Sequence, residues 1–325
     1  ARPGEFDPGW LAGALGGLDV VHVLGLPPYR PDAERRLDAA LTLVREAGVP
    51  LVVTAYHLTD PSRTDARLGR LLSQADAVLT LTDAAADLLA AEHGVSADVI
   101  AHPHALDFVR MRSPVRPRTA TLRVGLHLGA LPGGTGRPAR AALRLAGCLS
   151  RAVRRAPGRT ALRLSVHDGL ADPASTSYAP EALRRLDRLA RAAGGSLVLG
   201  PAPTESQMWD LLAEAGVAVL APDVRSHSVL PEACADLGVE MIAPSGSLAA
   251  AQALAWPGAR PPITYQLTGA ATEDSLVEAL TEAPRRGVAF RSDPVHRWGQ
   301  RVAAAAAHRT LFESLLARRG WSAPG

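Results

Sequence analysis

The chain has 325 residues, which is long for a single hydrophobic core and favours two domains. Hydrophobic residues make up 47% of it and the formal net charge is only +3, as in a well-packed globular protein and unlike a disordered one. The chain contains no lysine and no arginine-rich block with interleaved aromatic residues, so nucleic-acid binding is disfavoured.

The cysteine content and the hydropathy indicate the compartment. Cys148 and Cys234 are too few for a disulfide framework and lack metal-ligand spacing, which fits a reducing cytoplasm. No signal-like segment opens the sequence, and no apolar run approaches the ~18 residues that span a bilayer. The expectation is a cytoplasmic protein that is soluble or, at most, peripheral at the inner face of the membrane.

In the first third of the chain, buried-strand patterns alternate with helical patterns. The predicted strands are continuous apolar runs, such as DVVHVLG, and this favours a parallel sheet covered on both faces. Strands are expected at 19–25, 50–57, 76–82 and 97–103, and helices at 32–47, 66–73 and 83–93.

The alternation stops at residues 105–120, a segment with two prolines and four arginines that we interpret as an interdomain linker. It then resumes. Strands are expected at 122–129, 161–169, 196–200, 217–221, 239–243 and 262–267, and helices at 138–156, 180–193, 204–215, 229–237, 248–255, 274–282 and 294–318. The predicted division is an N-terminal Rossmann-like domain at 1–115, a second one at 116–293, and a helical segment at 294–325 that packs near the hinge.

A glycine-rich loop follows the strand predicted at 122–129. It contains Gly129, Gly133 and Gly134, and Arg137 stands at the start of the next helix. Glycines let a loop approach phosphate oxygens closely, and an arginine can bind them with a forked pair of hydrogen bonds. The spacing matches neither a Walker loop nor the dinucleotide G-x-G-x-x-G pattern. A flexible loop without a ligand is the alternative interpretation.

The stretch 217–245 is a second candidate. It contains a buried strand, a loop with Arg225, His227 and Ser228, and a helix that carries Glu232 in its first turn. Free backbone N–H groups at a helix start, beside polar side chains, suit an anion and above all a phosphate. An ordinary strand–helix crossover with a solvated loop is the alternative.

In the first domain, His57 is the best-placed histidine, because it ends a predicted strand and precedes a polar loop. A packed or solvent-edge histidine is the alternative there. The histidines lack helical metal-ligand spacing and a nearby acidic partner, so no metal site is predicted.

These segments, in their order and spacing, resemble the GT-B glycosyltransferases, and specifically glycosyltransferase family 4. The resemblance lies in DVVHVLG, PLVVTAYHLTDP, ADAVLTLTDAAADLLAAEHGV, VGLHLGALPGGTGR and VAVLAPDVRSHSVLPEACADLGVEMIAPS. It implies an α/β fold of two facing, Rossmann-like, doubly wound parallel-sheet domains with an interdomain cleft. It also implies metal- and cofactor-independent transfer of a sugar, expected to be a hexose, from a nucleotide-diphosphate sugar to an acceptor hydroxyl. The expected setting is a bacterial glycan, glycolipid or secondary-metabolite pathway.

The resemblance also assigns roles to residues. His57 and His227 are the catalytic candidates, and Glu232 is expected to bind the ribose hydroxyls. The expected donor-binding residues are Gly129, Gly133, Gly134, Arg137, Arg225, Ser228 and Glu232.

The sequence departs from the family pattern in three ways. Val224 occupies the position of the first glutamate of the family's E-x7-E motif, the usual diphosphate lysine is absent, and the N-terminal domain is short or begins outside this sequence. A degenerate, non-catalytic GT-B subunit is therefore the main alternative, and a nucleotide-sugar 2-epimerase a weaker one. The arginine-rich segments 110–123 and 137–163 are candidates for contact with an anionic membrane, although solvated surface is the favoured interpretation.

Overall fold

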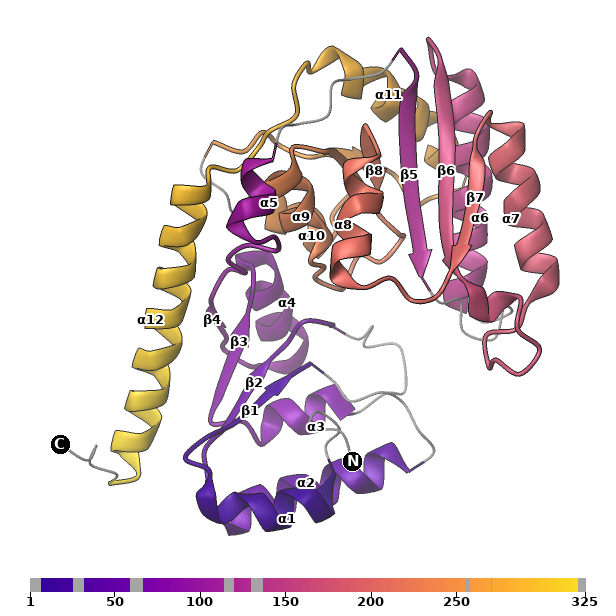
Figure 1. Cartoon of the computed structure of the whole chain (residues 1–325). Coiled ribbons are helices and arrows are strands. Elements are labelled where there is room, and N and C mark those ends of the chain that lie inside the picture. Colours follow the sequence, from indigo (N-terminus) through magenta and orange to yellow (C-terminus); the bar gives the residue numbers. More distant parts are fainter. Residues whose placement is uncertain are drawn as a thin grey trace. The chain divides into compact units, whose positions relative to one another are not determined.

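A computed structural model describes residues 7–25, 32–58, 67–113, 120–129, 137–254, 258–269 and 271–320. The chain divides into two compact units (Figure 1). The first unit consists of Ala1–Pro103, Arg225–His227 and Gly299–Gly325, and the second of His104–Val224 and Ser228–Trp298.

The first unit is built on a four-stranded parallel sheet whose spatial order, β1-β2-β3-β4, is the sequence order. All four residues of β2 are buried, which explains why the apolar run there is continuous. The strands are β1 (Val21–Leu24), β2 (Leu51–Thr54), β3 (Ala77–Thr80) and β4 (Asp98–Val99), and the helices are α1 (Pro8–Ala14), the 3-10 turn η1 (Leu15–Gly17), α2 (Ala33–Glu46), α3 (Arg67–Ser73) and α4 (Asp83–His93).

Helix α12 (Pro294–Arg318) contributes its residues from Gly299 onward to the first unit. Its residues Leu311, Phe312 and Leu315 pack into one apolar cluster with Val52 and Leu79 of the sheet. One side of α12 therefore packs on the sheet of the first unit through these three residues, of which Leu315 is buried.

The second unit contains a six-stranded parallel sheet in the order β10-β9-β8-β5-β6-β7. Its strands are β5 (Leu122–Gly129), β6 (Thr160–His167), β7 (Ser196–Gly200), β8 (Val217–Val219), β9 (Glu240–Pro244) and β10 (Ile263–Tyr265). Its helices are α5 (Phe108–Arg112), α6 (Arg137–Arg155), the 3-10 turn η2 (Asp168–Leu170), α7 (Pro180–Ala192), α8 (Glu205–Ala213), α9 (Leu230–Leu237), α10 (Leu248–Leu254), α11 (Ala271–Arg285) and the first residues of α12.

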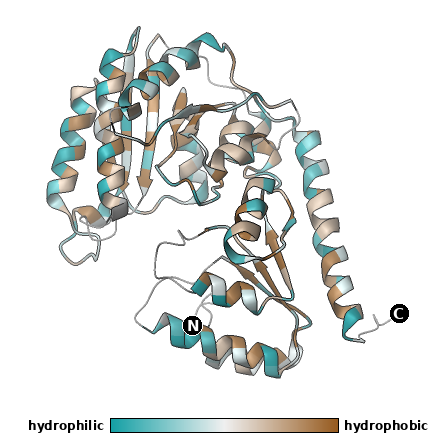
Figure 2. Ribbon diagram, turned by 180° about the vertical axis from the view of Figure 1, so that it is seen from behind, coloured by the Kyte–Doolittle hydropathy of each residue, from teal (hydrophilic) through white to brown (hydrophobic). Residues whose placement is uncertain are grey.

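Alternate residues of these strands enter two different cores. Val124 and Leu126 of β5 pack with helices α6, α7 and α11, whereas Ala218 of β8 and Met241 of β9 pack with α8, α9 and α10. Figure 2 shows the corresponding pattern, with apolar strands and helices that are hydrophilic on their outer sides. The predicted α/β class with parallel sheets in both halves is confirmed.

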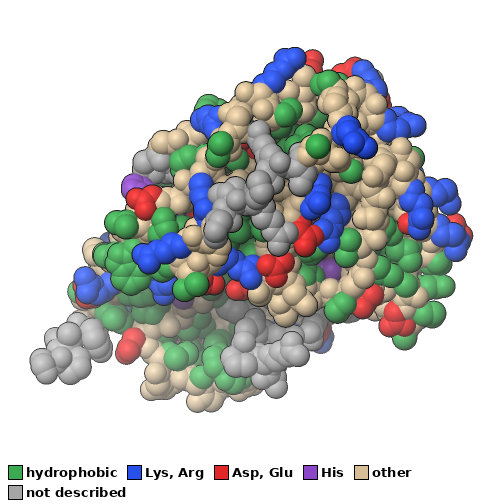
Figure 3. Space-filling view, turned by 45° about the horizontal axis from the view of Figure 1, so that its top comes forward, with side chains coloured by type: hydrophobic (Ala, Val, Ile, Leu, Met, Phe, Trp, Pro, Cys, Tyr) green, Lys and Arg blue, Asp and Glu red, His purple; other side chains and the backbone are tan. Residues whose placement is uncertain are grey.

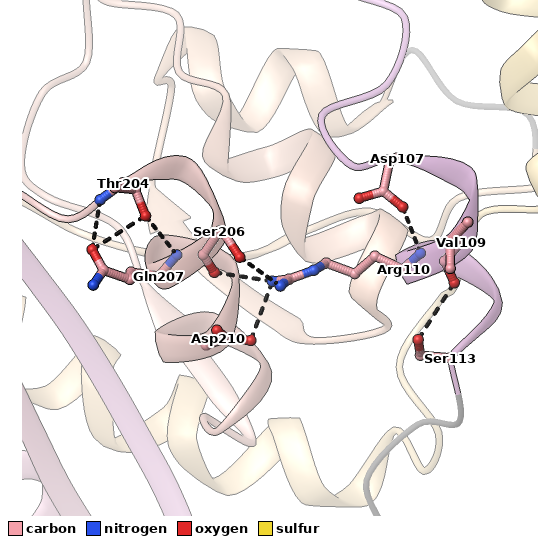
Figure 4. Close-up of polar contacts among 8 residues, drawn as sticks. All are labelled: Asp107, Val109, Arg110, Ser113, Thr204, Ser206, Gln207 and Asp210. Atoms are coloured by element: carbon pink, nitrogen blue, oxygen red, sulfur yellow. Dashed lines mark hydrogen bonds and ion pairs between the residues drawn. The ribbon is translucent and has the colours of Figure 1, made fainter.

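Part of the expected linker is a helix. Residues Phe108–Arg112 form α5, and Arg110 joins it to α8 through hydrogen bonds to the backbone oxygen (3.0 Å) and the hydroxyl (2.9 Å) of Ser206 and through an ion pair with Asp210 (3.2 Å) (Figure 4). The segment preceding α5 is also fixed, because the Asp236 carboxylate accepts hydrogen bonds from the backbone N–H groups of Ala105 and Leu106. Of the remainder, residues 114–119 lie outside the described residues.

Surface charges show no large basic region on the face seen in Figure 3. Arginine side chains are interspersed there with acidic and apolar ones. Among the described arginines, several are held in ion pairs, for example Arg151 and Arg155 with Glu273 at 2.5 and 2.9 Å. Among the described helices, none is both long enough and apolar enough to cross a membrane.

Candidate functional site

The strand order of the second sheet defines where a ligand is expected. From β5 the chain builds outward to β6 and β7 on one side, and then crosses to β8, β9 and β10 on the other. In open parallel sheets ligands bind beside the carboxyl ends of the strands, at the point where the order reverses. That point lies between β5 and β8. We call the edge at which all six strands end the carboxyl edge; the arrowheads of β5 and β6 mark it in Figure 1.

β5 ends at this edge in a glycine turn. Gly129, the last residue of the strand, has φ +61°, a conformation that favours glycine over other residues. The structure therefore places Gly129 where the chain leaves the sheet at the reversal point. Gly133 and Gly134 lie outside the described residues. Arg137 is the first residue of α6, and its side chain is likewise outside the description.

On the other side of the reversal point, the loop after β8 leads into α9 and is braced by Gln252 from α10. The Gln252 side-chain oxygen accepts the Ser228 backbone N–H, and its nitrogen donates to the Ser228 carbonyl and to Glu232 Oε1, each at 3.0 Å. Ser228 Oγ accepts the backbone N–H of Leu230 at 3.1 Å, in the first turn of the helix. Gln252 is buried, so these bonds hold Ser228 and Glu232 in a fixed arrangement.

Glu232 lies in the protein interior, with 2% of its surface exposed. Desolvation by burial raises the pKa of its carboxyl to about 8, although Arg297 and Gln252 act in the opposite direction. Its Oε2 is buried and has no hydrogen-bond partner among the described residues. A buried polar atom without a partner costs about 1–3 kcal/mol, and such an atom needs an explanation beyond folding.

One of the donor-side candidates, Arg225, and both catalytic candidates lie in the first unit, Arg225 and His227 in its three-residue segment Arg225–His227. Leu58 and Arg225 exchange hydrogen bonds, with Leu58 N–H donating to the Arg225 carbonyl and Arg225 Nε to the Leu58 carbonyl. The Arg225 guanidinium also forms an ion pair with Glu92. His57, which is exposed, forms an isolated β-bridge with Ser226. Arg225 is thus held by partners of its own.

His227 has a partner at each ring nitrogen. Nε2 lies 3.1 Å from Thr82 Oγ1, and Nδ1 lies 3.2 Å from the Tyr56 carbonyl oxygen, which also accepts the His227 backbone N–H. A carbonyl can only accept, so Nδ1 carries the proton and Nε2 accepts from Thr82. Burial lowers the pKa of His227 to about 4. His227 is therefore a neutral imidazole whose donor and acceptor are both occupied.

Two features of the second unit escaped the sequence reasoning. Gln252 lies 24 positions from Ser228, and nothing in its surroundings in the sequence distinguishes it. His127 lies two residues before the end of β5, His167 ends the neighbouring strand β6, and their rings are 5.8 Å apart. The motifs containing both histidines are visible in the sequence, but only the pairing of β5 with β6 shows that they meet. Among the described residues, no group of three acidic, histidine or cysteine side chains is placed to hold a metal ion.

Comparison with known proteins identifies the fold. The chain matches no protein-family model and no curated protein sequence. It is similar in structure to Anabaena Alr3699/HepE in complex with UDP, with a TM-score of 0.54 and 14% identity over 92% of this chain and 81% of that one. HepE is also known in complex with UDP-glucose.

Two further structures give the same result. Sucrose-phosphate synthase from Thermosynechococcus elongatus matches with a TM-score of 0.55 and 16% identity, over 93% of this chain and 75% of that one. The α,α-trehalose 6-phosphate synthase from Burkholderia multivorans matches with a TM-score of 0.56 and 15% identity, over 96% and 75%. The neighbours are GT-B glycosyltransferases, and this chain has the GT-B fold, as the sequence predicted; at these identities the likeness establishes the fold alone.

Proposed function

We propose that this protein is a glycosyltransferase that takes a sugar from a nucleotide-diphosphate sugar and transfers it to an acceptor hydroxyl. The observation that carries the proposal is the reversal of strand order between β5 and β8, with a left-handed glycine at one strand end and the braced α9 turn after the other. UDP and UDP-glucose in HepE support a nucleotide-sugar donor. Family 4 remains the specific relationship that we favour.

In this proposal the second unit binds the nucleotide. Gly129 and the following loop lie along the diphosphate, with Arg137 as its cation, and the first turn of α9, beginning after Ser228, presents backbone N–H groups. Glu232 accepts hydrogen bonds from the ribose hydroxyls. His57 acts on the donor sugar. Stabilising the departing diphosphate lowers the barrier to transfer.

The proposal includes independence from metal ions and from any cofactor besides the donor. Helix N–H groups and arginine would supply the positive charge that a divalent ion supplies elsewhere. Transfer measured after dialysis against EDTA is then expected to equal transfer in added Mg²⁺. A rate that collapses with EDTA and returns with Mg²⁺ contradicts this part.

The main test is a thermal-shift panel of UDP, GDP, ADP and dTDP, each with its sugar conjugates. A ligand that binds only the folded protein, at a hundred times its Kd, stabilises it by about 2.7 kcal/mol, which raises the melting temperature measurably. We expect one nucleotide to give the largest shift. The same nucleotide sugar is then assayed for transfer and for slow hydrolysis. If no member of the panel shifts the melting temperature, the donor site does not exist.

A non-catalytic nucleotide-binding subunit is the second candidate. Two observations favour it: Val224 stands where the family has a glutamate, and Glu232 is almost fully buried. This candidate predicts a nucleotide-dependent thermal shift without either transfer or hydrolysis. Turnover above that of a His57→Ala control excludes it.

A further inference from the structure

Two histidines meet at the carboxyl edge of the second unit. His127 on β5 is in register with Ser165 on β6, and His167 is the last residue of β6. The His127 and His167 ring centroids are 5.8 Å apart, with the rings tilted by 50°. Both side chains are half-buried, so they are accessible from solvent at the strand ends.

The orientation of the His127 ring is fixed. Nδ1 lies 2.9 Å from Ser165 Oγ, which ties one edge of the ring to β6. Nε2 is directed to the strand end, because a Cβ atom built on Gly129 would lie 3.8 Å from it. A ligand that approaches the backbone at the glycine turn therefore meets His127 Nε2.

Further charged groups lie around this pair among the described residues. Arg123 and Arg163 lie on the same face of β5 and β6, farther from the carboxyl edge, and Arg163 is paired with Glu214. Asp168 follows His167 and is exposed. β8, on the other side of β5, contributes only the apolar residues Val217–Val219.

We propose that His127 and His167 form an anion site that binds a phosphate group of the nucleoside diphosphate beside Gly129. The inference rests on the proposed function and assigns two further positioning residues to its nucleotide site. The bound group is a phosphate at the strand end. One of its oxygens accepts a hydrogen bond from the Nε2–H of His127, and the phosphate lies close enough to His167 to interact with it electrostatically.

Binding of the phosphate is coupled to the uptake of a proton by the protein. Burial, and secondly His167, lower the pKa of His127 to about 4 without ligand, so the ring is neutral at pH 7. An opposite charge in contact raises such a pKa by about 1–3 units. The Ser165 hydroxyl can donate to Nδ1 or accept from it, so both protonation states keep that hydrogen bond. The bound state therefore takes up protons that the free state does not hold, and phosphate affinity increases as the pH falls.

The experiment uses the full chain and the nucleoside diphosphate from the panel of UDP, GDP, ADP and dTDP that gives the largest thermal shift. Affinities for this diphosphate and for its nucleoside are measured by calorimetry at about pH 7.5 and about pH 6, for the wild type, His127→Gln and His167→Gln. The matched control is His22→Gln, because His22 is also a half-buried strand histidine, 2.7 Å from the hydroxyl of Thr54, but lies in the first unit.

We expect His127→Gln to weaken diphosphate binding about tenfold at pH 6, which corresponds to a rise of about three units in the pKa of His127 on binding, and His167→Gln to weaken it in the same direction. Nucleoside binding is expected to stay unchanged in both variants. Repeating the titration in buffers of different ionisation enthalpy is expected to show proton uptake in the wild type and in His22→Gln, and a reduced uptake in the other two variants.

Equal diphosphate affinity in wild type, His127→Gln and His167→Gln at both pH values would overturn the histidine site and leave the proposed function standing. Equal losses for diphosphate and nucleoside in both variants, with lowered melting temperatures, would also overturn it, because they mark a structural role. Absence of binding by any nucleotide to the wild type would overturn the proposed function itself, and the histidine site with it.

Discussion

At Glu232 the requirements of folding and of ligand binding conflict. Burial holds the pKa of the carboxyl at about 8, and Gln252 satisfies only Oε1. The folded-state pKa lies above the ordinary value of 4.5, so the folded protein binds a proton that the unfolded chain releases between these two values. The contribution of this group to stability is therefore fully present below about pH 4.5 and is lost as the pH rises toward 8.

The isosteric variant Glu232→Gln tests this conflict. The amide cannot ionise, so the variant is expected to be more stable than the wild type by up to about 3 kcal/mol near pH 7. The two proteins should converge at about pH 5. Urea unfolding at both pH values measures the difference. A variant that is equally destabilised at both would mean that Glu232 is ionised in the folded protein.

The same variant is expected to bind nucleotide more weakly, because hydrogen bonds from two ribose hydroxyls favour the ionised carboxylate with its two acceptor oxygens, whereas the amide offers one oxygen and cannot ionise. We expect about a tenfold loss, or ~1.4 kcal/mol, within the range for hydrogen bonds to charged groups. Titration with the nucleoside alone isolates this contact from the diphosphate. Unchanged nucleoside affinity would remove Glu232 from the site.

His57 provides a residue-scale test of catalysis. It is exposed, so His57→Ala is expected to change stability by no more than about 0.5 kcal/mol. The transfer rate should fall by about 100-fold or more, the lower range for a lost acid–base or charge-stabilising group, while nucleotide affinity stays within about twofold. Exposed His296→Ala on α12 is the matched control. Equal rates in the two variants would exclude a catalytic role for His57.

At the scale of the element, α9 combines stabilising and functional contacts within eight residues. Glu232 and Asp236 stand one turn apart and both are buried. Asp236 Oδ1 accepts from Arg297 Nε at 2.8 Å, in an ion pair with 0% and 1% of the two side chains exposed. The other carboxylate oxygen accepts the backbone N–H groups of Ala105 and Leu106. One helix thus fixes the chain before α5 and the start of α12.

Removing one member of the Asp236–Arg297 ion pair is expected to lower the free energy of unfolding more than replacing both members with apolar residues. Asp236→Ala removes the carboxylate from this buried ion pair and should lower the free energy of unfolding by about 3–5 kcal/mol. The double variant Asp236→Leu/Arg297→Met should recover part of that loss. Recovery stays incomplete, because the N–H groups of Ala105 and Leu106 also lose their acceptor. Chemical denaturation of the wild type, Asp236→Ala and the double variant measures these differences in the free energy of unfolding. Equal stability of Asp236→Ala and wild type would contradict the prediction.

At the scale of the whole molecule, the sequence predicted most elements to within a few residues. The continuous apolar runs indicated parallel strands, and β5 and β7 have the predicted bounds. Gly238 ends α9 in the left-handed conformation, as the helix-stop pattern indicated. The expected strand at 97–103 is only the pair Asp98–Val99, because the bridge to β3 covers just these two residues.

The sequence by itself determined the class of this protein, its alternating strands and helices, and the strand ends at which polar residues gather. These properties follow from patterns a few residues long, such as apolar runs, caps and glycines. Only the tertiary structure decided which strands are neighbours, and so that β5 lies beside β8 and that His127 meets His167. It also decided that Gln252 holds Ser228 and Glu232 and that Asp236 meets Arg297. Such contacts join residues far apart in the chain, and they depend on how the elements pack rather than on any local pattern.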